Sequence, residues 1–281
     1  MSESIKDYPA TKWRAGAIAT EGDHLVVEEP LEIRLAGRRF TLTMRTPGHD
    51  EELAAGFLLS EAIVRAGDKI DKFSRPKSAR NRDNIVVVDL GDGKKVKLNF
   101  AQRFGTISSS CGLCGKESIE AIRQNFPAIT STSWRIDLET LLSLPDKLRA
   151  NQSDFARTGG IHAAGIFDAK GNALIVREDI GRHNAVDKVI GRALLDGKLP
   201  LDRHALLVSG RASFEIMQKA LAAGIPIVAS VSAPSSLAME FARESNQTLA
   251  GFLRPPSFNI YSHVERVILD QSNSRVTPSS D

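Results

Sequence analysis

The chain has 281 residues, 42% of them hydrophobic and 25% charged, so it can bury a sizeable core as a globular protein. No apolar run approaches the ~20 residues of a membrane span, and the N-terminus lacks the basic and then apolar layout of a secretory signal. We therefore expect a cytoplasmic protein with no membrane association. The net charge of +3 suits an anionic small ligand and is too small to indicate a nucleic-acid partner.

Residues 16–105 predict a small α+β roll as the first domain. Alternating apolar residues on both sides of the Gly37 turn indicate a hairpin, and a second hairpin is expected around the glycine-rich turn at 91–94. Between them, apolar residues at helical spacing and acidic residues in the first turn predict a helix. The expected elements are strands at 24–36 and 38–46, a helix at 49–64, and strands at 84–90 and 95–100.

Residues 106–270 predict the second domain, in which helices and strands alternate. Alternation of this kind is typical of a layered α/β sheet with helices on its faces. The expected elements are helices at 116–126, 137–150, 183–195, 214–224 and 235–245, and strands at 161–167, 172–178, 204–210, 225–230 and 248–254.

Two segments are too polar to predict a packed element. The basic run at 69–82 reads as a solvated excursion, with contact to an anionic ligand or partner as the alternative. The tail at 271–281 has too little apolar surface to order itself.

Three junctions between a strand and the following helix indicate an anion site. Unpaired backbone N–H groups and the helix dipole favour anions at such positions. Any one junction alone fits ordinary helix capping, but three together, two of them with an arginine, favour an extended ligand that carries phosphates. The residues are Asp179, Gly181, Arg182 and His183 in the first junction, Ser209, Gly210, Arg211 and Ser213 in the second, and Ser230, Ser232, Ser235 and Ser236 in the third.

His162 follows Gly159 and Gly160 on a predicted strand. The two glycines permit a tight turn or a close approach of the backbone to a ligand. The histidine fits either a satisfied core residue or a catalytic group.

The only two cysteines, Cys111 and Cys114, form a C-x-x-C pair within the segment SSSCGLCGKESIE. In a reducing compartment a structural disulfide is disfavoured. Structural zinc would need two further ligands, and a zinc deaminase would need a glutamate two residues after His162, where Ala164 stands. We therefore expect no zinc or other metal. A C-x-x-C redox module stays open, although the surrounding glycines do not fit a thioredoxin-like helix start.

A nucleophilic sulfur on a loop is the remaining interpretation of the cysteines. The start of the next helix and the Lys116 ammonium would stabilise a thiolate at Cys111 or Cys114. A thiolate that attacks an activated sulfur donor becomes a persulfide, whose outer sulfur can pass to an acceptor. This chemistry is sulfur carriage.

Four motifs in order resemble the formate dehydrogenase accessory sulfurtransferases, the FdhD family: SSSCGLCGKESIE, TGGIHAAG, EDIGRHNAVDKVIG and SGRASFEIMQKALAAGIPIVASVSAPSSLA. The resemblance runs from about residue 16 to about residue 262. It implies a cytoplasmic homodimer with a cytidine-deaminase-like core that lacks zinc. It also implies that sulfur passes from a cysteine desulfurase to the molybdenum bis(molybdopterin guanine dinucleotide) cofactor before that cofactor enters formate dehydrogenase.

The resemblance also assigns residues. It implies that Cys111 carries the persulfide. Cys114 is the second expected catalytic residue, which on chemical grounds would assist release of the sulfur. We expect Arg182, His183 and Arg211 to contact the cofactor as well, with the arginines and Arg254 meeting its phosphates. The rival hypothesis is a cofactor-binding chaperone whose cysteines are structural or regulatory. The segment implied to hold the guanine dinucleotide consists of Phe252, Leu253, Arg254, Pro255, Pro256 and Ser257.

Overall fold

The computed structural model describes residues 4–78, 81–91, 126–130 and 133–269. The predicted strand at 95–100, the tail at 271–281 and both cysteines lie outside the described residues. So does the predicted helix at 116–126, apart from Phe126, which is buried in the main core.

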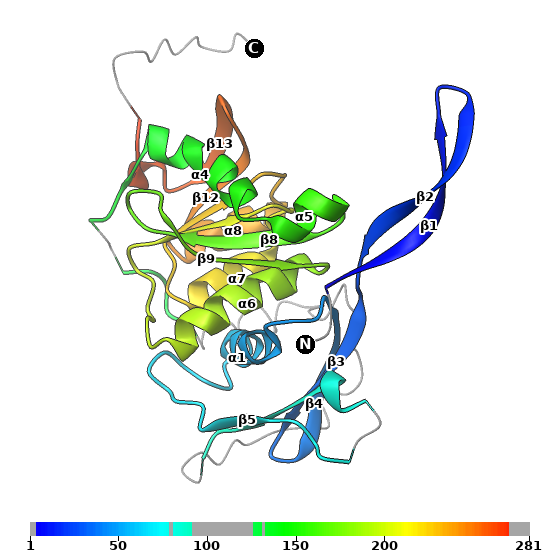
Figure 1. The fold of residues 1–281 in the computed structure, drawn as a ribbon. Coiled ribbons are helices and arrows are strands. Elements are labelled where there is room, and N and C mark those ends of the chain that lie inside the picture. The colour runs from blue at the N-terminus through cyan, green and yellow to red at the C-terminus, as the bar shows by residue number, and fades with distance from the viewer. Residues whose placement is uncertain (1–3, 79–80, 92–125, 131–132, 270–281) are drawn as a thin grey trace.

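A six-stranded sheet forms the centre of the molecule, as the alternating pattern predicts (Figure 1). Its strand order is β13-β12-β11-β10-β8-β9. The strands β10, β11 and β12 run parallel, whereas β8 and β13 run in the opposite direction. Because β9 is antiparallel to β8, it runs in the same direction as β10. The bounds are β8 (His162–Phe167), β9 (Ala173–Asp179), β10 (Ala205–Val208), β11 (Ile227–Ser230), β12 (Thr248–Arg254) and β13 (Ser257–Ser262).

Helices cover both faces of this sheet. Alternate strand residues such as Ile166 and Val208 pack into one apolar cluster with three helices, and Ala163 and Leu207 point to a second cluster on the other face with one helix. The layered α/β class expected from the sequence is confirmed, and the specific likeness to cytidine deaminase stays a prediction. The first face carries α6 (Arg182–Leu195), α7 (Phe214–Ala222) and α8 (Ser236–Glu244), and the second carries α4 (Leu138–Ala150), followed by the short α5 (Ser153–Thr158).

A smaller four-stranded sheet of order β4-β3-β6-β5 lies beyond α1, which packs against α6 (Figure 1). The predicted helix is confirmed. The predicted hairpin around Gly37 is confirmed as β3 and β4, but its first strand does not extend back to residue 24, because residues 24–26 belong to β2 in a different sheet. The bounds are β3 (Glu29–Leu35), β4 (Arg38–Arg45), α1 (Asp50–Ser60), β5 (Lys72–Ser74) and β6 (Ile85–Asp89).

The basic run at 69–82 is more structured than expected. It contains β5, which pairs with β6, and the guanidinium of Arg75 lies 2.8 Å from the carboxylate of Asp50. Asp50 is buried and also accepts from Arg45 at 2.8 Å. Most described residues of the run are exposed, in keeping with a solvated segment, and Arg75 in addition pairs with a buried carboxylate.

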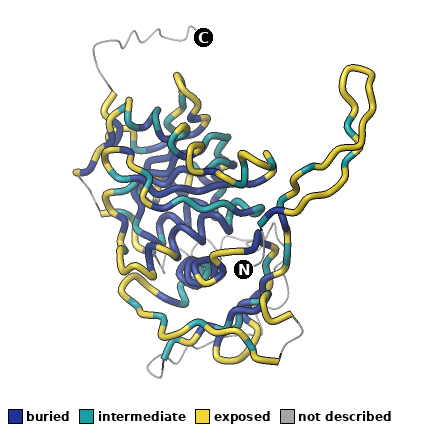
Figure 2. Tube along the Cα trace, in the orientation of Figure 1, coloured by how far each residue is buried: buried dark blue, intermediate teal, exposed yellow. Residues whose placement is uncertain are grey.

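The helices α1 and α6 cross at close range through two glycines. A Cβ atom at Gly56 would lie 1.9 Å from the carbonyl oxygen of Asp187, and one at Gly191 would lie 1.8 Å from that of Glu52. Glycine therefore allows the two backbones to touch. As a result, one apolar cluster contains Leu53 of α1 together with residues of both sheets, and the burial is continuous in Figure 2.

The N-terminal residues form an antiparallel hairpin, β1 (Ile5–Arg14) and β2 (Ala17–Val26), which the sequence analysis did not predict. Ala15 and Gly16 have positive φ values of 48° and 88°, as a two-residue hairpin turn requires. The hairpin projects from the body of the molecule (Figure 1). Smaller elements are the strands β7 (Ile136–Asp137) and β14 (Val267–Ile268) and the 3-10 helices η1 (Arg82–Asn84) and η2 (Val264–Arg266).

Candidate functional site

The strand directions bring the three predicted junctions to one edge of the six-stranded sheet, the edge formed by the strand ends. The carboxyl ends of β9, β10 and β11 lie at this edge, and α6, α7 and α8 begin beside them. Because β8 and β13 run the other way, their starts, His162 and Ser257, lie at the same edge. The sequence places these groups far apart along the chain, and the sheet topology gathers them.

Arg182 lies over the turn that follows β10, and Arg211 within this turn is close enough for its positive charge to act on Arg182. A Cβ atom at Gly210 would lie 3.2 Å from the His162 ring and 3.4 Å from Cδ of Arg182, so the turn fits closely beneath both side chains. Burial lowers the pKa of Arg182, and the positive charge of Arg211 adds to this effect. Within the described chain, the buried Nε of Arg182 has no hydrogen-bond partner. An anionic ligand would supply that acceptor and relieve the repulsion.

His183 is held by the start of α7. Its Nε2 atom lies 3.1 Å from the Ser213 hydroxyl and 2.8 Å from the Glu215 carboxylate. The hydrogen bond with His183 lowers the pKa of Glu215. Both partners meet the same ring nitrogen, whereas a catalytic triad uses the two nitrogens for different partners. These residues therefore do not form a Ser-His-Glu triad, and Glu215 instead balances part of the local positive charge.

His162 is a half-buried residue with a partner in the fold. Its Nδ1 atom lies 3.4 Å from the Ser209 hydroxyl, which also accepts a hydrogen bond of 2.9 Å from the backbone N–H of Ala163. Burial lowers the pKa of His162, and the positive charges of Arg182 and His183 lower it further. The imidazole is therefore harder to protonate than that of a free histidine, which limits the positive charge that it can add to the site.

Two serines of the third junction form hydrogen bonds within the fold that stabilise this edge of the sheet. The buried Ser230 hydroxyl donates to the carbonyl oxygen of Gly210 at 2.7 Å and so connects two junctions. Ser235 caps α8 by accepting from the backbone N–H of Ala238 at 3.2 Å. These two hydroxyls fit the capping interpretation that was weighed against ligand binding.

The segment implied to bind guanine lies directly beside the third junction. The backbone N–H of Phe252 donates to the Ser232 carbonyl at 3.0 Å, and Nε of Arg254 donates to the Val231 carbonyl at 3.0 Å. Leu253 is fully buried in the second apolar cluster, so its side chain serves the core. The exposed members of the segment are Phe252, Arg254, Pro255, Pro256 and Ser257.

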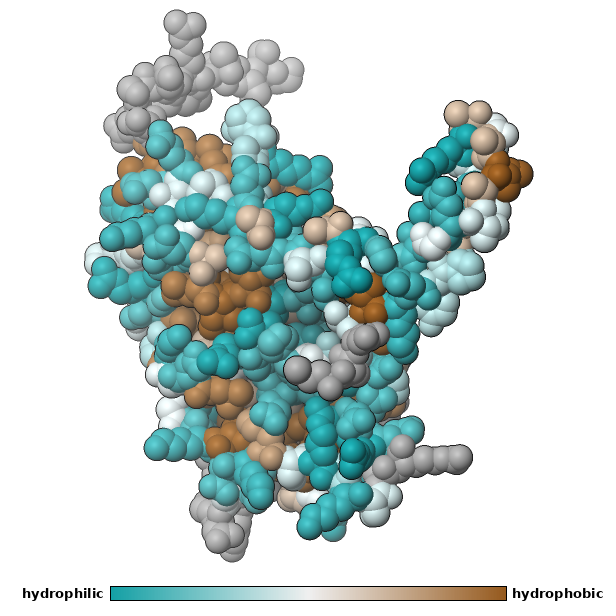
Figure 3. Space-filling model, viewed as in Figure 1, coloured by the Kyte–Doolittle hydropathy of each residue, from teal (hydrophilic) through white to brown (hydrophobic). Residues whose placement is uncertain are grey.

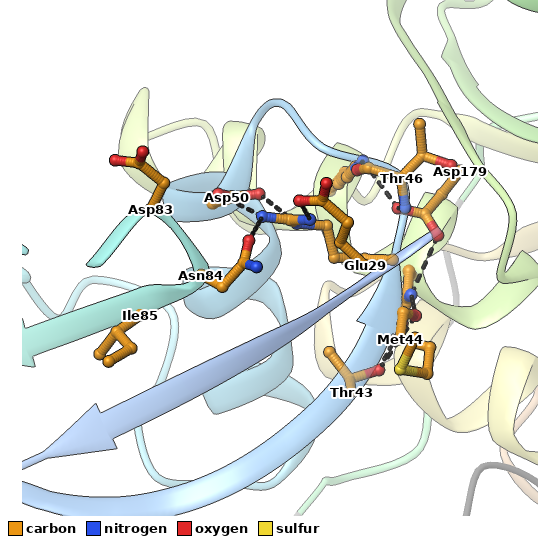
Figure 4. Close-up of polar contacts among 12 residues, drawn as sticks. Glu29, Thr43, Met44, Thr46, Asp50, Asp83, Asn84, Ile85 and Asp179 are labelled. Atoms are coloured by element: carbon orange, nitrogen blue, oxygen red, sulfur yellow. Dashed lines mark hydrogen bonds and ion pairs between the residues drawn. The ribbon is translucent and has the colours of Figure 1, made fainter. Parts of the chain in front are cut away.

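Buried Asp179 fixes the first junction to the smaller sheet (Figure 4). One carboxylate oxygen accepts from the N–H of Gly181 at 2.8 Å, and the other lies 2.7 Å from the ammonium of buried Lys188. The backbone N–H of Thr46, between β4 and α1, also donates to Asp179 at 3.3 Å. Asn184 bridges the same regions, because its amide donates to Asp179 at 3.0 Å and to the Met44 carbonyl at 2.7 Å.

The sequence analysis singled out Asp179 but missed Thr46, Asn184 and Lys188. A signal was present for the last two, because they are polar residues four apart in the predicted α6 and so share a helix face. Nothing in the sequence indicated the backbone contact at Thr46, which depends on how the two sheets pack.

The described residues contain no group of three or more histidine, cysteine, aspartate or glutamate side chains placed to hold a metal ion. No described helix is long and apolar enough to cross a membrane. Cys111 and Cys114 lie outside the described residues, so their assigned roles stay predictions.

Residues 26–268 match the FdhD/NarQ family. The chain belongs to this family. The match includes both sheets and all three junctions, and it begins at the last residue of β2, so nearly all of the hairpin precedes it. The resemblance inferred from the four sequence motifs is therefore confirmed.

Curated FdhD/NarQ relatives match along most of their length. The chain is 50% identical to a Streptomyces avermitilis protein named sulfur carrier protein FdhD, over 91% of this chain and 93% of that protein. It is 47% identical to a Mycobacterium tuberculosis protein of the same name, over 90% of this chain and 95% of that protein. It is 43% identical to another of that name from Sulfurisphaera tokodaii, over 94% of this chain and 99% of that protein.

A crystal structure from Desulfotalea psychrophila, titled as a formate dehydrogenase accessory protein, has the same fold. It aligns with a TM-score of 0.75 and 23% sequence identity, over 95% of this chain and 100% of that one. At this identity the similarity concerns the fold alone. It supports the arrangement of sheets that brings the three junctions together.

Proposed function

We propose that this protein is a sulfur carrier that serves formate dehydrogenase. The thiolate of Cys111 attacks the sulfane sulfur of a donor persulfide, forms a new S–S bond and releases the donor thiolate. The outer sulfur then passes to a molybdenum bis(molybdopterin guanine dinucleotide) cofactor, which is the acceptor substrate. In this step the S–S bond breaks, Cys111 leaves as the thiolate, and a thiol reductant supplies the two electrons that take the transferred sulfur to the sulfide level. Family membership and the relatives named sulfur carrier protein FdhD support this proposal.

The cationic edge of the sheet is the observation that carries the acceptor side of the proposal. Arg182 and Arg211 lie together, Arg182 retains an unused buried donor, and three helices begin beside them. A bis-dinucleotide bears several phosphates, which suit guanidinium groups and helix N-termini. Phe252 offers an exposed aromatic face for a guanine base, and Arg254 lies two residues away.

The partners follow from the same chemistry. A cysteine desulfurase would supply the donor persulfide, and a formate dehydrogenase would receive the sulfurated cofactor. The cytoplasm is the proposed compartment, because a persulfide carrier needs its thiols reduced before loading. The proposed state of the protein is a homodimer.

Replacing each cysteine tests the sulfur-carrier proposal. Cys111→Ala should abolish both formate dehydrogenase maturation and the mass increase of one sulfur after treatment with a desulfurase and cysteine. Cys114→Ala should reduce maturation less, because the persulfide can still form. Full maturation by Cys111→Ala would refute the persulfide assignment. Cofactor binding without bound sulfur would favour the chaperone, and a reversible Cys111–Cys114 disulfide without bound sulfur would favour the redox module.

Arg254→Ala tests the acceptor site. If Arg254 contacts a phosphate, loss of the charged hydrogen bond should weaken the binding of a guanine nucleotide by ~1.5–3 kcal/mol, roughly ten- to a hundredfold. Calorimetry measures this change. Arg203→Ala is the matched control, because Arg203 precedes β10 at the opposite edge of the sheet. Persulfide formation at Cys111 should be normal in both variants, and unchanged affinity for Arg254→Ala would move the phosphate contact to Arg182 or Arg211.

A further inference from the structure

The β1–β2 hairpin extends from the body without a supporting layer along most of its length (Figure 1). At its base, Ile5 is buried, and β2 touches α5. Farther out, large apolar side chains are exposed: Tyr8 by 50%, Trp13 by 70% and Ile18 by 73%. Figure 3 shows hydrophobic surface near the free end of the arm. A two-stranded hairpin alone is marginally stable in water, whereas additional strands make such a ribbon stable.

The edges of the hairpin differ in their capacity to pair. Strand β1 contains Pro9, which has no backbone N–H to donate, whereas β2 contains no proline. An exposed strand edge of this kind is a template for another strand. The free edge of β2 is therefore the side on which a sheet could grow.

Beyond Lys6, which pairs with Glu29 at the base, the charges on one face of the hairpin are arranged in two zones. By strand alternation and pairing, Lys12, Arg14, Glu21 and Asp23 share this face. The basic pair lies toward the tip, and the acidic pair lies toward the middle. Two identical hairpins in antiparallel orientation would therefore bring the basic zone of each against the acidic zone of the other. A two-fold axis produces this antiparallel arrangement.

We propose that the β2 strands of two copies of this chain pair antiparallel about Thr20 and join the two hairpins into one four-stranded sheet. In this register Ala17 opposes Asp23 of the second copy, and Ala19 opposes Glu21 of the second copy. The small alanines let the neighbouring Arg14 and Lys12 side chains reach across to those carboxylates. In the separate chain Lys12 lies 3.4 Å from its own Asp23, so the pairing exchanges this contact for one between copies. On the other face, Ile18 lies over Gly22 of the second copy.

The contact made by this pairing is small. A standard interface uses about 20–30 residues from each partner, whereas this pairing uses the ten residues of β2 and the Lys12 and Arg14 side chains of β1, so we expect a weak dimer whose population depends on concentration. The proposal gives the expected homodimer a specific surface. It does not depend on sulfur transfer. A chain that forms no persulfide could still dimerise, and a monomeric chain could still form the persulfide, so the two proposals are tested separately.

A cysteine placed on the two-fold axis tests the register. In the full chain with both native cysteines replaced by serine, Thr20→Cys should form a disulfide between two copies when copper–phenanthroline and oxygen take up the two electrons and two protons. Directly opposed residues have the Cα separation that a disulfide needs. Gly22→Cys is the matched control, because residue 22 opposes residue 18. Rapid cross-linking of Thr20→Cys alone is expected, and equal or absent cross-linking of both variants would overturn the register.

Reversing the charges of each zone tests whether the partner of the hairpin is a second copy of this chain. The tip variant Lys12→Glu with Arg14→Glu and the middle variant Glu21→Lys with Asp23→Lys should each raise the dimer dissociation constant at least tenfold in analytical ultracentrifugation. An equimolar mixture of the two should restore dimers, because each reversed zone then meets its opposite. Lys170→Glu, a reversal outside the hairpin, should have no effect. A monomeric wild-type chain, or dimers that do not respond to reversal, would overturn the proposal and assign the hairpin to another protein.

Discussion

Gly191 in α6 and Gly22 in β2 are both glycines, but an added methyl group would meet very different surroundings at the two positions. At Gly191 it would lie 1.8 Å from a backbone oxygen of α1, and at Gly22 it would find nothing within 4 Å. One ion pair from the core and one from the hairpin also differ in how closely they are surrounded. Asp187 and Lys219 lie 2.8 Å apart, with side chains 2% and 10% exposed, whereas Asp23 and Lys12 lie 3.4 Å apart, with side chains 47% and 25% exposed.

This contrast shows where the structure is fixed by neighbours distant in sequence. Where α1 and α6 cross, Gly56 and Gly191 each lie against the backbone of the other helix, so even one added methyl group would clash. In the hairpin the conformation depends on strand pairing and on the turn. Substitutions should therefore have large effects at the helix crossing and small effects in the isolated hairpin.

The sharpest test compares Gly191→Ala with Gly22→Ala. Gly191→Ala should lower the free energy of unfolding by more than about 4 kcal/mol, because the helices must separate to admit a methyl group. Gly22→Ala should change it by less than about 0.5 kcal/mol. Denaturant titration measures both. Similar values for the two variants would break the contrast between these regions.

A second test removes the lysine from each ion pair. Lys219→Met should cost about 3 kcal/mol, because it leaves the carboxylate of Asp187 buried without its cation. Burial already raises the pKa of Asp187, so uptake of a proton keeps the cost at the low end of the range. Lys12→Met should cost at most about 1 kcal/mol. Both values are measured at a concentration at which the chain is monomeric, and a cost for Lys12→Met near that for Lys219→Met would show that the Lys12–Asp23 pair of the monomer is not solvated.

A smaller effect on stability is expected when the pH is lowered and Glu52 becomes protonated. Burial tends to raise its pKa, but hydrogen bonds from His49 and Arg177 outweigh burial and lower the pKa from 4.5 to about 2. The stabilisation is therefore complete above about pH 4.5 and is lost as the pH falls toward 2. Glu52→Gln should be less stable than wild type at pH 7, with a difference that shrinks across this interval.

Much of the main sheet could be predicted from the sequence, because its elements have local signals. The apolar spacing of α6 and the strand pair β8–β9 around the Asp168 turn are examples, and both lie within about a residue of the predicted positions. The three junctions were also predicted, because serine, glycine and arginine between a strand and a helix are recognisable in sequence.

The rest depended on contacts between distant segments. Val27 breaks a stretch of apolar alternation into two strands of different sheets, and no local pattern marks that point. Likewise, the pairing of Arg75 with buried Asp50 could not be inferred, because both read as ordinary surface charges in the sequence. The contact between Thr46 and Asp179 exists only because the smaller sheet packs beside the first junction.

The direct contact between α1 and α6 also has a consequence for how the protein denatures. The first apolar cluster includes Leu31 and Val86 of the smaller sheet together with Leu206 and Val228 of the larger one. Neither sheet can lose its order without exposing apolar surface of the other. Heating should therefore give a single calorimetric transition, with equal calorimetric and van't Hoff enthalpies, rather than two. By the same reasoning, neither half of the chain would retain its structure if it were produced alone.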